Sequence, residues 1–204
     1  MRHITAEDAE LAMDALLGIR TTGRDESHAD QDNNPYEPTP YPVLERLANS
    51  GLVGKRNLLV DYGCGKGRVG FYLSYQARCR TLGVERDRWL YECALRNRDS
   101  AHVAAKTAFT LADAAQFAVP PEADRFYLFN PFSAAVFEQV LGQLRTSLAT
   151  HPREALLFLY YPDDSYLAPL ERVGWLEPCD PIDCRDLFGG EDPRETIVVY
   201  RTRP

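Results

Sequence analysis

The stretch "VDYGCGKGR", Val60–Arg68, ends an apolar run with an acid and continues with three glycines at alternate positions. Glycine adopts positive φ readily and lets a ligand approach the backbone, so the stretch predicts a ligand-binding turn between a strand and a helix. Turns of this kind usually bind phosphate. Asp61 opposes that use, because its negative charge repels a phosphate in a partly buried site. The fold therefore contains a strand–turn–helix unit whose ligand tolerates an acid.

A dinucleotide is one candidate ligand, because "GKGRVG", Gly65–Gly70, has the spacing G-x-G-x-x-G. That triplet begins two residues late, since Gly63 is the first glycine after the apolar run. A positively charged ligand without phosphate removes the conflict with Asp61. S-adenosylmethionine (SAM) has an ammonium group, a sulfonium group and no phosphate. We therefore expect SAM as the cofactor and keep an NAD-linked oxidoreductase as an alternative.

The rest of the chain alternates between the two periodicities of strands and helices. Apolar runs predict five strands, and helical patterns stand between most of them. The final segment has two strand-like runs without a helix between them, which predicts an antiparallel element at one edge. Alternating strands and helices form a mostly parallel sheet covered on both faces, so the sequence predicts a doubly wound α/β fold. The predicted strands are 56–62, 80–85, 106–113, 124–130 and 154–161.

The N-terminal part, residues 1–50, adds two helices and a long loop. Residues 5–19 have a Thr cap and an apolar helical stripe, and residues 41–51 end at Gly51. The intervening loop is polar and contains three prolines. Long loops in compact domains are often lids, although a proline-stiffened linker remains the alternative. We expect residues 1–50 to form one unit with the SAM-binding domain, residues 51–204.

Composition favours an ordinary globular protein. Among 204 residues, 45% are hydrophobic and 26% are charged, and the net charge of −7 argues against a broad nucleic-acid surface. The N-terminus has acids where a secretory signal would be apolar, and no apolar run is long enough to span a bilayer, so we expect a cytoplasmic protein. The five cysteines lack paired ligand spacing, which predicts free thiols and no metal site.

The motif "DYGCGKG", Asp61–Gly67, resembles the first motif of the class I SAM-dependent methyltransferases, an acid followed by G-x-G-x-G. Together with "Y-x-P-T-P-Y", it is similar to an uncharacterised bacterial methyltransferase-like group. Glu85 in "TLGVERD" and Asp113 in "LADAAQF" stand where this family has acids after its second and third strands. The resemblance implies a Rossmann-like, seven-stranded sheet with an antiparallel last strand. It also implies cofactor contacts from Asp61, Gly63, Cys64, Gly65, Gly67, Glu85, Asp113 and Ala114.

In this family the fourth strand ends beside the transferred methyl group. The stretch "YLFNPFS" offers Asn130 and Phe132 there, with Asn130 near both cofactor and acceptor. Amino-group methyltransferases often have N-P-P-Y at this position, where the Asn side chain accepts a hydrogen bond from the substrate NH₂. This chain lacks the second proline, so a role for Asn130 as a strand-ending cap stays open.

Further candidates come from the loop and the fifth strand. The loop offers Tyr36, Thr39 as a cofactor contact, and Tyr41, while Tyr161 ends the fifth strand. Arg68 contacts the cofactor carboxylate or pairs with an acid. The residues predicted to act on the acceptor are Asn130, Phe132, Tyr41 and Tyr161. The predicted function is methyl transfer to an amino nitrogen of a small molecule or protein, favoured over nucleic acid; a SAM-binding sensor or scaffold without catalysis is the alternative.

Overall fold

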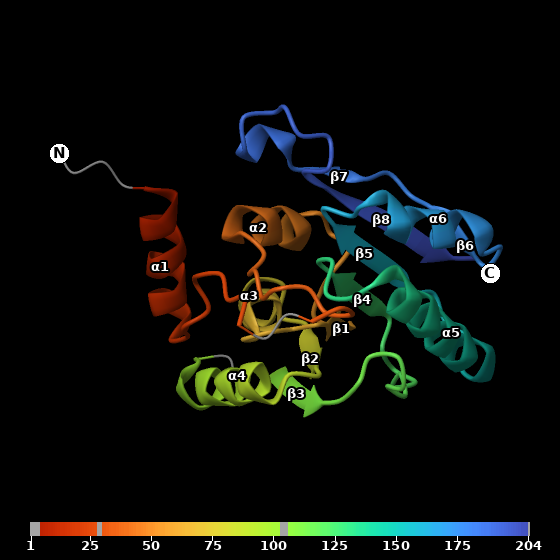
Figure 1. Cartoon of the computed structure of the whole chain (residues 1–204), viewed down its shortest axis with the longest axis horizontal. Coiled ribbons are helices and arrows are strands. Elements are labelled where there is room, and N and C mark those ends of the chain that lie inside the picture. Colours follow the sequence, from red (N-terminus) through yellow and green to blue (C-terminus); the bar gives the residue numbers. More distant parts are fainter. Residues whose placement is uncertain (1–4, 28–29, 103–105, 204) are drawn as a thin grey trace.

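The computed structural model describes residues 5–27, 30–102 and 106–203. It consists of one eight-stranded sheet with helices packed on both faces (Figure 1). The helices are α1 (Ala6–Leu17), α2 (Tyr41–Asn49), α3 (Arg68–Gln76), α4 (Arg88–Ser100), α5 (Ala134–Thr150) and α6 (Asp164–Arg172). The strands are β1 (Leu58–Tyr62), β2 (Arg80–Glu85), β3 (Thr107–Leu111), β4 (Arg125–Leu128), β5 (Leu156–Tyr160), β6 (Leu176–Pro178), β7 (Ile182–Asp183) and β8 (Thr196–Thr202).

The strand order is β3-β2-β1-β4-β5-β8-β6, with β7 also paired to β8. Strands β1 to β5 are parallel to one another, and β8 is antiparallel to both β5 and β6. This order confirms the predicted doubly wound α/β fold with a reversed last strand. The chain crosses from one side of the sheet to the other after β3, and ligands bind at such a switch point, outside the carboxyl ends of the strands.

The sheet has one strand more than the seven that the resemblance implies. The additional strand is β7, which has two residues and pairs with β8 along the same edge as β6. Between β6 and β7 the chain contains Pro181, which has no N–H to donate to a ladder. The proline therefore divides one edge position into two short strands.

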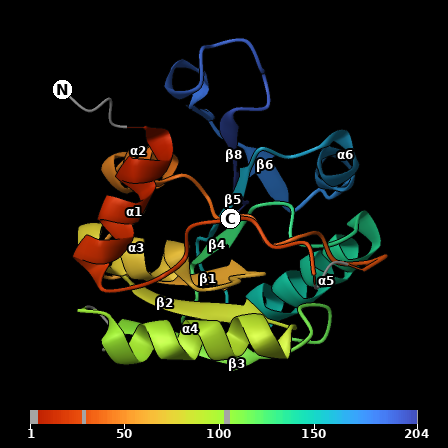
Figure 2. The same ribbon diagram turned by 60° about the vertical axis from the view of Figure 1, so that its left-hand side comes forward.

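Strands β1 and β5 are buried along their whole length, and β4 is buried apart from Arg125, which explains the continuous apolar runs in this part of the sheet. Leu59 and Phe158 face one core, formed with α2 and α3. Val60 and Leu157 face a second core, formed with α5 and α6. Figure 2 shows the sheet between these two sets of helices. Asp61 interrupts the first core at the carboxyl end of β1, so the fold itself brings a carboxylate to this edge.

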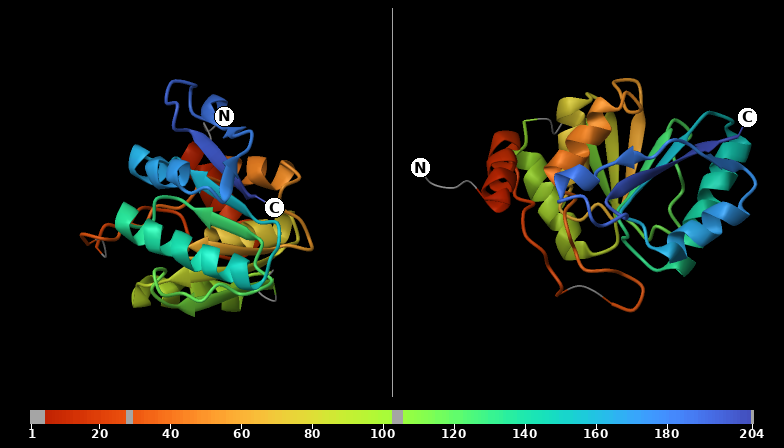
Figure 3. Two further views of the ribbon diagram at one scale, coloured as in Figure 1. Left: turned by 90° about the vertical axis from the view of Figure 1, so that its right-hand side faces the viewer. Right: turned by 90° about the horizontal axis from the view of Figure 1, so that it is seen from above.

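The N-terminal residues pack against α3 and the carboxyl edge of the sheet. Thr5 and Asp8 form a capping box that begins α1, and Gly18 ends the helix with φ of 74°. The following residues form a long loop that returns to α2, which Figure 3 shows from two sides. We call this loop the 18–40 segment. Within the described residues, none of the helices combines the length and the apolar character needed to cross a bilayer.

Candidate functional site

A cavity of about 430 Å³ lies at the carboxyl edge of the sheet. Its floor is the loop after β1, residues 63–67, which we call the glycine loop. Its walls come from the ends of β2 and β3 and from the turn after β4. Residues 30–37 of the 18–40 segment form the outer wall. The volume is in the range of ligand pockets, about 300–1,000 Å³. Among the predicted site residues, the lining includes Gly63, Gly65, Glu85, Asp113, Ala114 and Phe132.

The glycine loop is covered closely by two other segments. Gly63 and Gly65 have φ of 69° and 54°, a conformation that L side chains rarely adopt. A Cβ on Gly63 would overlap the Pro131 ring, and a Cβ on Gly65 would overlap the ring of Tyr36. Both glycines are therefore required by packing as well as by the turn. Gly67 does not line the cavity; it faces Phe109 and begins α3.

Glu85 joins the end of β2 to the glycine loop. One of its carboxylate oxygens accepts the Gly65 N–H at 2.8 Å. The other oxygen accepts the N–H groups of Arg86 and Asp87, each at 2.8 Å. Burial raises the pKa of Glu85, and these three N–H donors partly offset that effect. A hydrogen-bond acceptor is thus held in a fixed orientation at the cavity wall.

Asp61 is buried beside the glycine loop, with only 3% of its surface exposed. Its Oδ2 atom has no hydrogen-bond partner among the described residues. Burial, and then the negative charge of Glu85, raise the pKa of Asp61 well above its usual value. A buried carboxyl group without a partner is unfavourable unless a donor or a cation meets it. This arrangement fits a ligand with a positive group and disfavours a phosphate.

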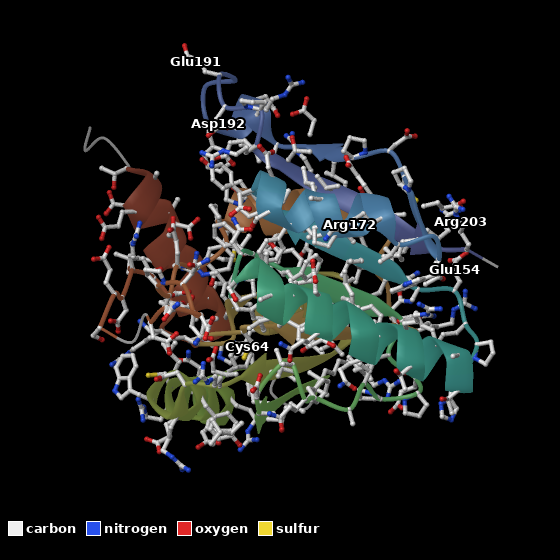
Figure 4. All side chains as sticks on the ribbon, turned by 45° about the vertical axis from the view of Figure 1, so that its right-hand side comes forward. Cys64, Glu154, Arg172, Glu191, Asp192 and Arg203 are labelled. Carbon is white, nitrogen blue, oxygen red and sulfur yellow. The ribbon has the colours of Figure 1, made fainter. Side chains whose placement is uncertain are left out.

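Cys64, labelled in Figure 4, is buried within the glycine loop. Burial, followed by the charges of Glu85 and Asp61, raises its pKa, so the thiol stays protonated and unreactive. All five cysteines are free, as the sequence predicts. Within the described residues, no three His, Cys, Asp or Glu side chains come together as a candidate metal site.

The third wall contains Asp113 and Ala114, directly after β3. The Asp113 carboxylate accepts the N–H of Ala115 at 2.9 Å, and its side chain remains exposed to solvent. Ala114 is buried against the second core. Both residues line the cavity, and their contact with a cofactor base stays a prediction.

The turn after β4 has an unusual backbone. Asn130 has φ of 41°, and its Nδ2 donates to the carbonyl of Tyr161 at 2.7 Å. Tyr161 has φ of 52°, so two non-glycine residues in left-handed conformations are bonded to each other. Such conformations cost about 1–3 kcal/mol each and occur preferentially at functional sites. Pro131 and Phe132 follow in the cavity wall, and the Oδ1 atom of Asn130 has no hydrogen bond among the described residues.

Seven predicted residues are absent from the cavity lining: Asp61, Cys64, Gly67, Asn130, Thr39, Tyr41 and Tyr161. The side chains of the last three are bonded elsewhere. Tyr41 begins α2 and donates its hydroxyl to Asp14 of α1 at 2.5 Å, and the Thr39 hydroxyl lies 3.0 Å from that of Tyr127. Both side chains are buried, and their hydroxyl groups pair with buried polar atoms of α1 and of β4. The hydroxyl of Tyr161 points to Asp192, which Figure 4 places on the outer loop between β7 and β8. Tyr161 contacts the turn after β4 through its backbone carbonyl, which accepts the hydrogen bond from Asn130.

The structure adds residues that the sequence did not indicate. Asn34 donates its Nδ2 to the Asn130 carbonyl at 2.7 Å, and its N–H donates to the Pro131 carbonyl at 3.2 Å. Lys66 of the glycine loop lies over the Tyr36 ring, with Nζ 4.5 Å from the ring centroid. Neither residue follows a recognisable pattern, because each role depends on contacts between segments far apart in the chain.

The arrangement of elements is shared with known methyltransferases. One is an RNA methyltransferase from Salinibacter ruber in complex with S-adenosyl-L-homocysteine, with a TM-score of 0.57 and 24% identity over 81% of this chain and 92% of that chain. Another is a TehB-like SAM-dependent methyltransferase from Corynebacterium glutamicum, with a TM-score of 0.54 and 21% identity over 79% and 88%. A third is the mitomycin 7-O-methyltransferase MmcR, with a TM-score of 0.58 and 16% identity over 79% and 53%.

The sequence itself matches no protein-family model and no curated protein. The likeness to solved structures therefore rests on the order and direction of the strands and on the helices that connect them. These neighbours act on different acceptors: one is an RNA methyltransferase, and another is a mitomycin 7-O-methyltransferase. By its architecture, this chain has the Rossmann-like fold of the class I SAM-dependent methyltransferases.

Proposed function

We propose that this protein is a SAM-dependent methyltransferase whose acceptor is an amino nitrogen of a small molecule or protein. The observation that carries the cofactor assignment is the buried, unpartnered carboxyl group of Asp61 below the glycine loop. Its partner must be a cation or a hydrogen-bond donor, and the SAM ammonium group is both. When bound, SAM supplies a methyl group on a sulfonium leaving group.

The residues around the cavity fit the other parts of this cofactor. Glu85 is an acceptor suited to the ribose hydroxyls, and Asp113 with Ala114 suits the adenine. The backbone of Gly63 and Gly65 faces the cavity without side chains. An NAD-type pyrophosphate would meet the negative charge of Glu85 and of Asp61 instead of free N–H donors. The Gly65 N–H is already bonded to Glu85, which further disfavours a phosphate.

The acceptor assignment rests on Asn130. Its Nδ2 is engaged by Tyr161, so its Oδ1 is left to accept a hydrogen bond from an N–H group at the cavity. Such a bond would turn the nitrogen lone pair toward the methyl group, and alignment of this kind contributes up to about 7–11 kcal/mol to lowering a barrier. Phe132 provides an apolar wall beside it. These contacts favour catalysis over a role as a sensor or scaffold.

The charge at the cavity mouth favours a neutral or cationic acceptor. Asp30, Asp32 and Glu37 of the 18–40 segment line the cavity together with Asp87. Arg86 and Arg88 also line the cavity and offset part of this charge, and Arg86 lies 3.7 Å from Asp30. Proteins that bind RNA or DNA normally present clustered Lys and Arg to the phosphates. An amine reaches such a mouth more easily than a phosphate backbone does.

Calorimetric titration with S-adenosyl-L-homocysteine (SAH) tests the cofactor, with NADH as the control. We expect dissociation constants of about micromolar for SAH, and no heat from NADH. Binding of NADH without SAH would contradict the proposal. The acceptor is then tested by mass spectrometry after incubation with SAM and three panels: small amines, proteins and unmodified RNA. Methylation confined to RNA would retain the methyltransferase and overturn the amine assignment.

A further inference from the structure

Arg68 is the first residue of α3 and follows the glycine loop directly. Its side chain is only 2% exposed, which is rare for an arginine and requires strong partners. It forms ion pairs with two acids of α1, Glu10 and Asp14, the latter at 3.7 Å. Arg68 thus connects the glycine loop to the N-terminal helix through charges that are largely removed from water.

The same guanidinium binds both ends of the 18–40 segment. Its Nε donates to the Thr21 hydroxyl at 2.7 Å, and its Nη2 donates to the Thr22 hydroxyl at 2.8 Å. Its Nη1 donates to the carbonyl of Thr39 at 3.2 Å. Because one planar group holds positions at the beginning and at the end of the segment, the two ends are fixed relative to each other and to the glycine loop.

Asp14 completes the arrangement from the other side. Its carboxylate accepts the N–H groups of Thr21 and Thr22 at 2.5 and 2.8 Å, and the hydroxyl of Tyr41 at 2.5 Å. The Tyr41 ring lies under Arg68, with 4.2 Å between the guanidinium carbon and the ring centroid. These three donors all bond to the buried Asp14 carboxylate. The ends of the segment are therefore held by a buried network of hydrogen bonds and ion pairs around Asp14 and Arg68.

The middle of the segment, held at both ends, rests on the proposed site. The Asp32 carbonyl accepts the Ser133 N–H at 2.9 Å, and Asn34 binds the turn after β4 through two hydrogen bonds. The Tyr36 ring covers Gly65, and its hydroxyl donates to the Thr21 carbonyl at 2.6 Å. Releasing the ends therefore removes the outer wall of the cavity.

We propose that Arg68 is the positioning residue that keeps the 18–40 segment closed over the cofactor cavity. Arg68 does not line the cavity, so it acts through the segment and α1. The link to cofactor binding rests on the proposed function, whereas closure of the segment can be measured without any ligand. The closed segment would retain the cofactor and exclude water during transfer.

The chain provides a reporter of opening, because Arg24 is the single Lys or Arg between Arg20 and Arg46. Trypsin cuts after Arg24 only when the surrounding backbone opens locally. The sharpest variant is Thr22→Val, which has nearly the same shape and leaves the ion pairs of Arg68 with α1 in place. It removes the Thr22 hydroxyl, which accepts from Arg68 and donates to Asp14 at 3.1 Å. Thr146→Val is the matched control, since the Thr146 hydroxyl bonds only within α5.

We expect Thr22→Val and Arg68→Lys to be cleaved at Arg24 about tenfold faster than the wild type, because each loses a charge-assisted hydrogen bond. Cleavage at sites outside the segment should stay as in the wild type, which separates local opening from the loss of global stability that a lost hydrogen bond brings. Both variants should bind SAH about tenfold more weakly, and SAH should slow cleavage of the wild type. Thr146→Val should behave as the wild type throughout.

Wild-type cleavage rates at Arg24 in both variants would overturn the proposal. So would faster cleavage that leaves SAH affinity unchanged, because closure would then not serve the cofactor. If the wild-type protein binds no SAH, the proposed function fails, while the ligand-free cleavage rates still decide whether Arg68 holds the segment.

Discussion

The backbone N–H of Gly65 donates to the Glu85 carboxylate at 2.8 Å, so the turn after β1 is bonded to the end of β2. The glycine loop therefore does not present free N–H groups to a ligand, as a phosphate-binding loop does. It presents an acid that is oriented by three N–H donors. The Gly65–Glu85 bond makes this edge of the cavity unfavourable for a phosphate, and we propose that it binds hydroxyl groups.

Replacement of Glu85 by Gln tests this assignment. One carboxylate oxygen becomes an NH₂ group, which faces N–H donors and cannot accept from a ribose hydroxyl. We expect SAH affinity to fall at least tenfold, as is usual for a lost charged acceptor. Calorimetry measures the change, and Glu138→Gln, an exposed acid on α5, is the control. Unchanged SAH affinity in Glu85→Gln would remove Glu85 from the cofactor site.

Asp61→Asn should separate stability from binding. The folded-state pKa of Asp61 is raised above the unfolded value of about 3.9. The contribution of Asp61 to the free energy of unfolding is therefore fully present below the unfolded pKa, and it is lost as pH rises through the folded pKa. The neutral Asn should raise the free energy of unfolding by about 1–3 kcal/mol at alkaline pH and little in acid. SAH binding should be lost.

Thermal unfolding of Asp61→Asn at about pH 3.5 and pH 8.5, beside the wild type, measures the first part, because stability varies with pH wherever folded and unfolded pKa values differ. A variant that is less stable than the wild type at both pH values would show that Asp61 is held by a partner in the folded protein. Retained SAH affinity would show that the ammonium group binds elsewhere.

Tyr41→Phe tests the network around Asp14. Burial raises the pKa of Asp14, but hydrogen bonds from Thr21, Tyr41 and Thr22 outweigh burial and hold the pKa below its usual value. The stability from Asp14 is therefore present above its unfolded pKa and is lost as pH falls through the folded pKa. Removing one donor should cost about 1–3 kcal/mol near neutral pH.

Urea unfolding measures the loss, and the difference from the wild type should shrink below about pH 4, where the carboxyl group of the unfolded chain is protonated. A constant difference across pH would indicate that the Tyr41 hydroxyl stabilises something other than the Asp14 carboxylate. Because Tyr41 does not line the cavity, turnover at saturating SAM and acceptor should remain close to that of the wild type.

The side chain of Asn130 is tested by two variants that differ in backbone strain. Asn130→Ala and Asn130→Gly both remove Oδ1, but glycine suits φ of 41° and alanine does not. Both should lose at least about 100-fold in kcat with SAH affinity retained, a typical effect of removing a positioning hydrogen bond. Both variants also lose the hydrogen bond to the Tyr161 carbonyl, and the alanine variant should lose about 1 kcal/mol more stability than the glycine variant. Recovery of turnover in the glycine variant would assign Asn130 a purely conformational role.

Gly63→Ala should damage both fold and site. The new Cβ would overlap the Pro131 ring and force a side chain into φ of 69°. We expect a loss of about 1–3 kcal/mol and weaker SAH binding. Gly142→Ala is the matched control: it lies within α5 with open space around it and should stabilise the protein by about 0.4–1 kcal/mol. Equal thermal midpoints in the two variants would contradict the packing at Gly63.

The sequence predicts the parts of the site that depend on local chemistry. Asp61 and the glycines lie at the end of β1, and Glu85 and Asp113 follow the neighbouring strands, so strand order brings them to one edge of the sheet without further information. The predicted fold is confirmed. It could be predicted because the central strands are buried on both faces and therefore appear in the sequence as continuous apolar runs. Local pattern and global fold agree throughout this half of the molecule.

The rest depends on contacts between distant segments. Tyr41 was expected at the acceptor, but its hydroxyl binds Asp14, and nothing in the local sequence relates the two. The aromatic ring of Tyr161 was expected there as well, but a left-handed backbone turns its carbonyl to Asn130 and its hydroxyl to Asp192. These placements follow from the pairing of buried donors and acceptors, which only the folded chain determines.

The contact between Asn33 and Phe132 has a consequence for synthesis of the chain. The two residues form a backbone bridge, although nearly half of the sequence separates them. The ribosome synthesises Asn33 long before the turn after β4. Until that turn has been made, the loop around Asn33 is exposed to solvent because its bridge partner does not yet exist. The polar, proline-rich composition of the loop protects the nascent chain from aggregation during this time. The loop exposes neither an apolar face nor an unpaired strand edge to other chains.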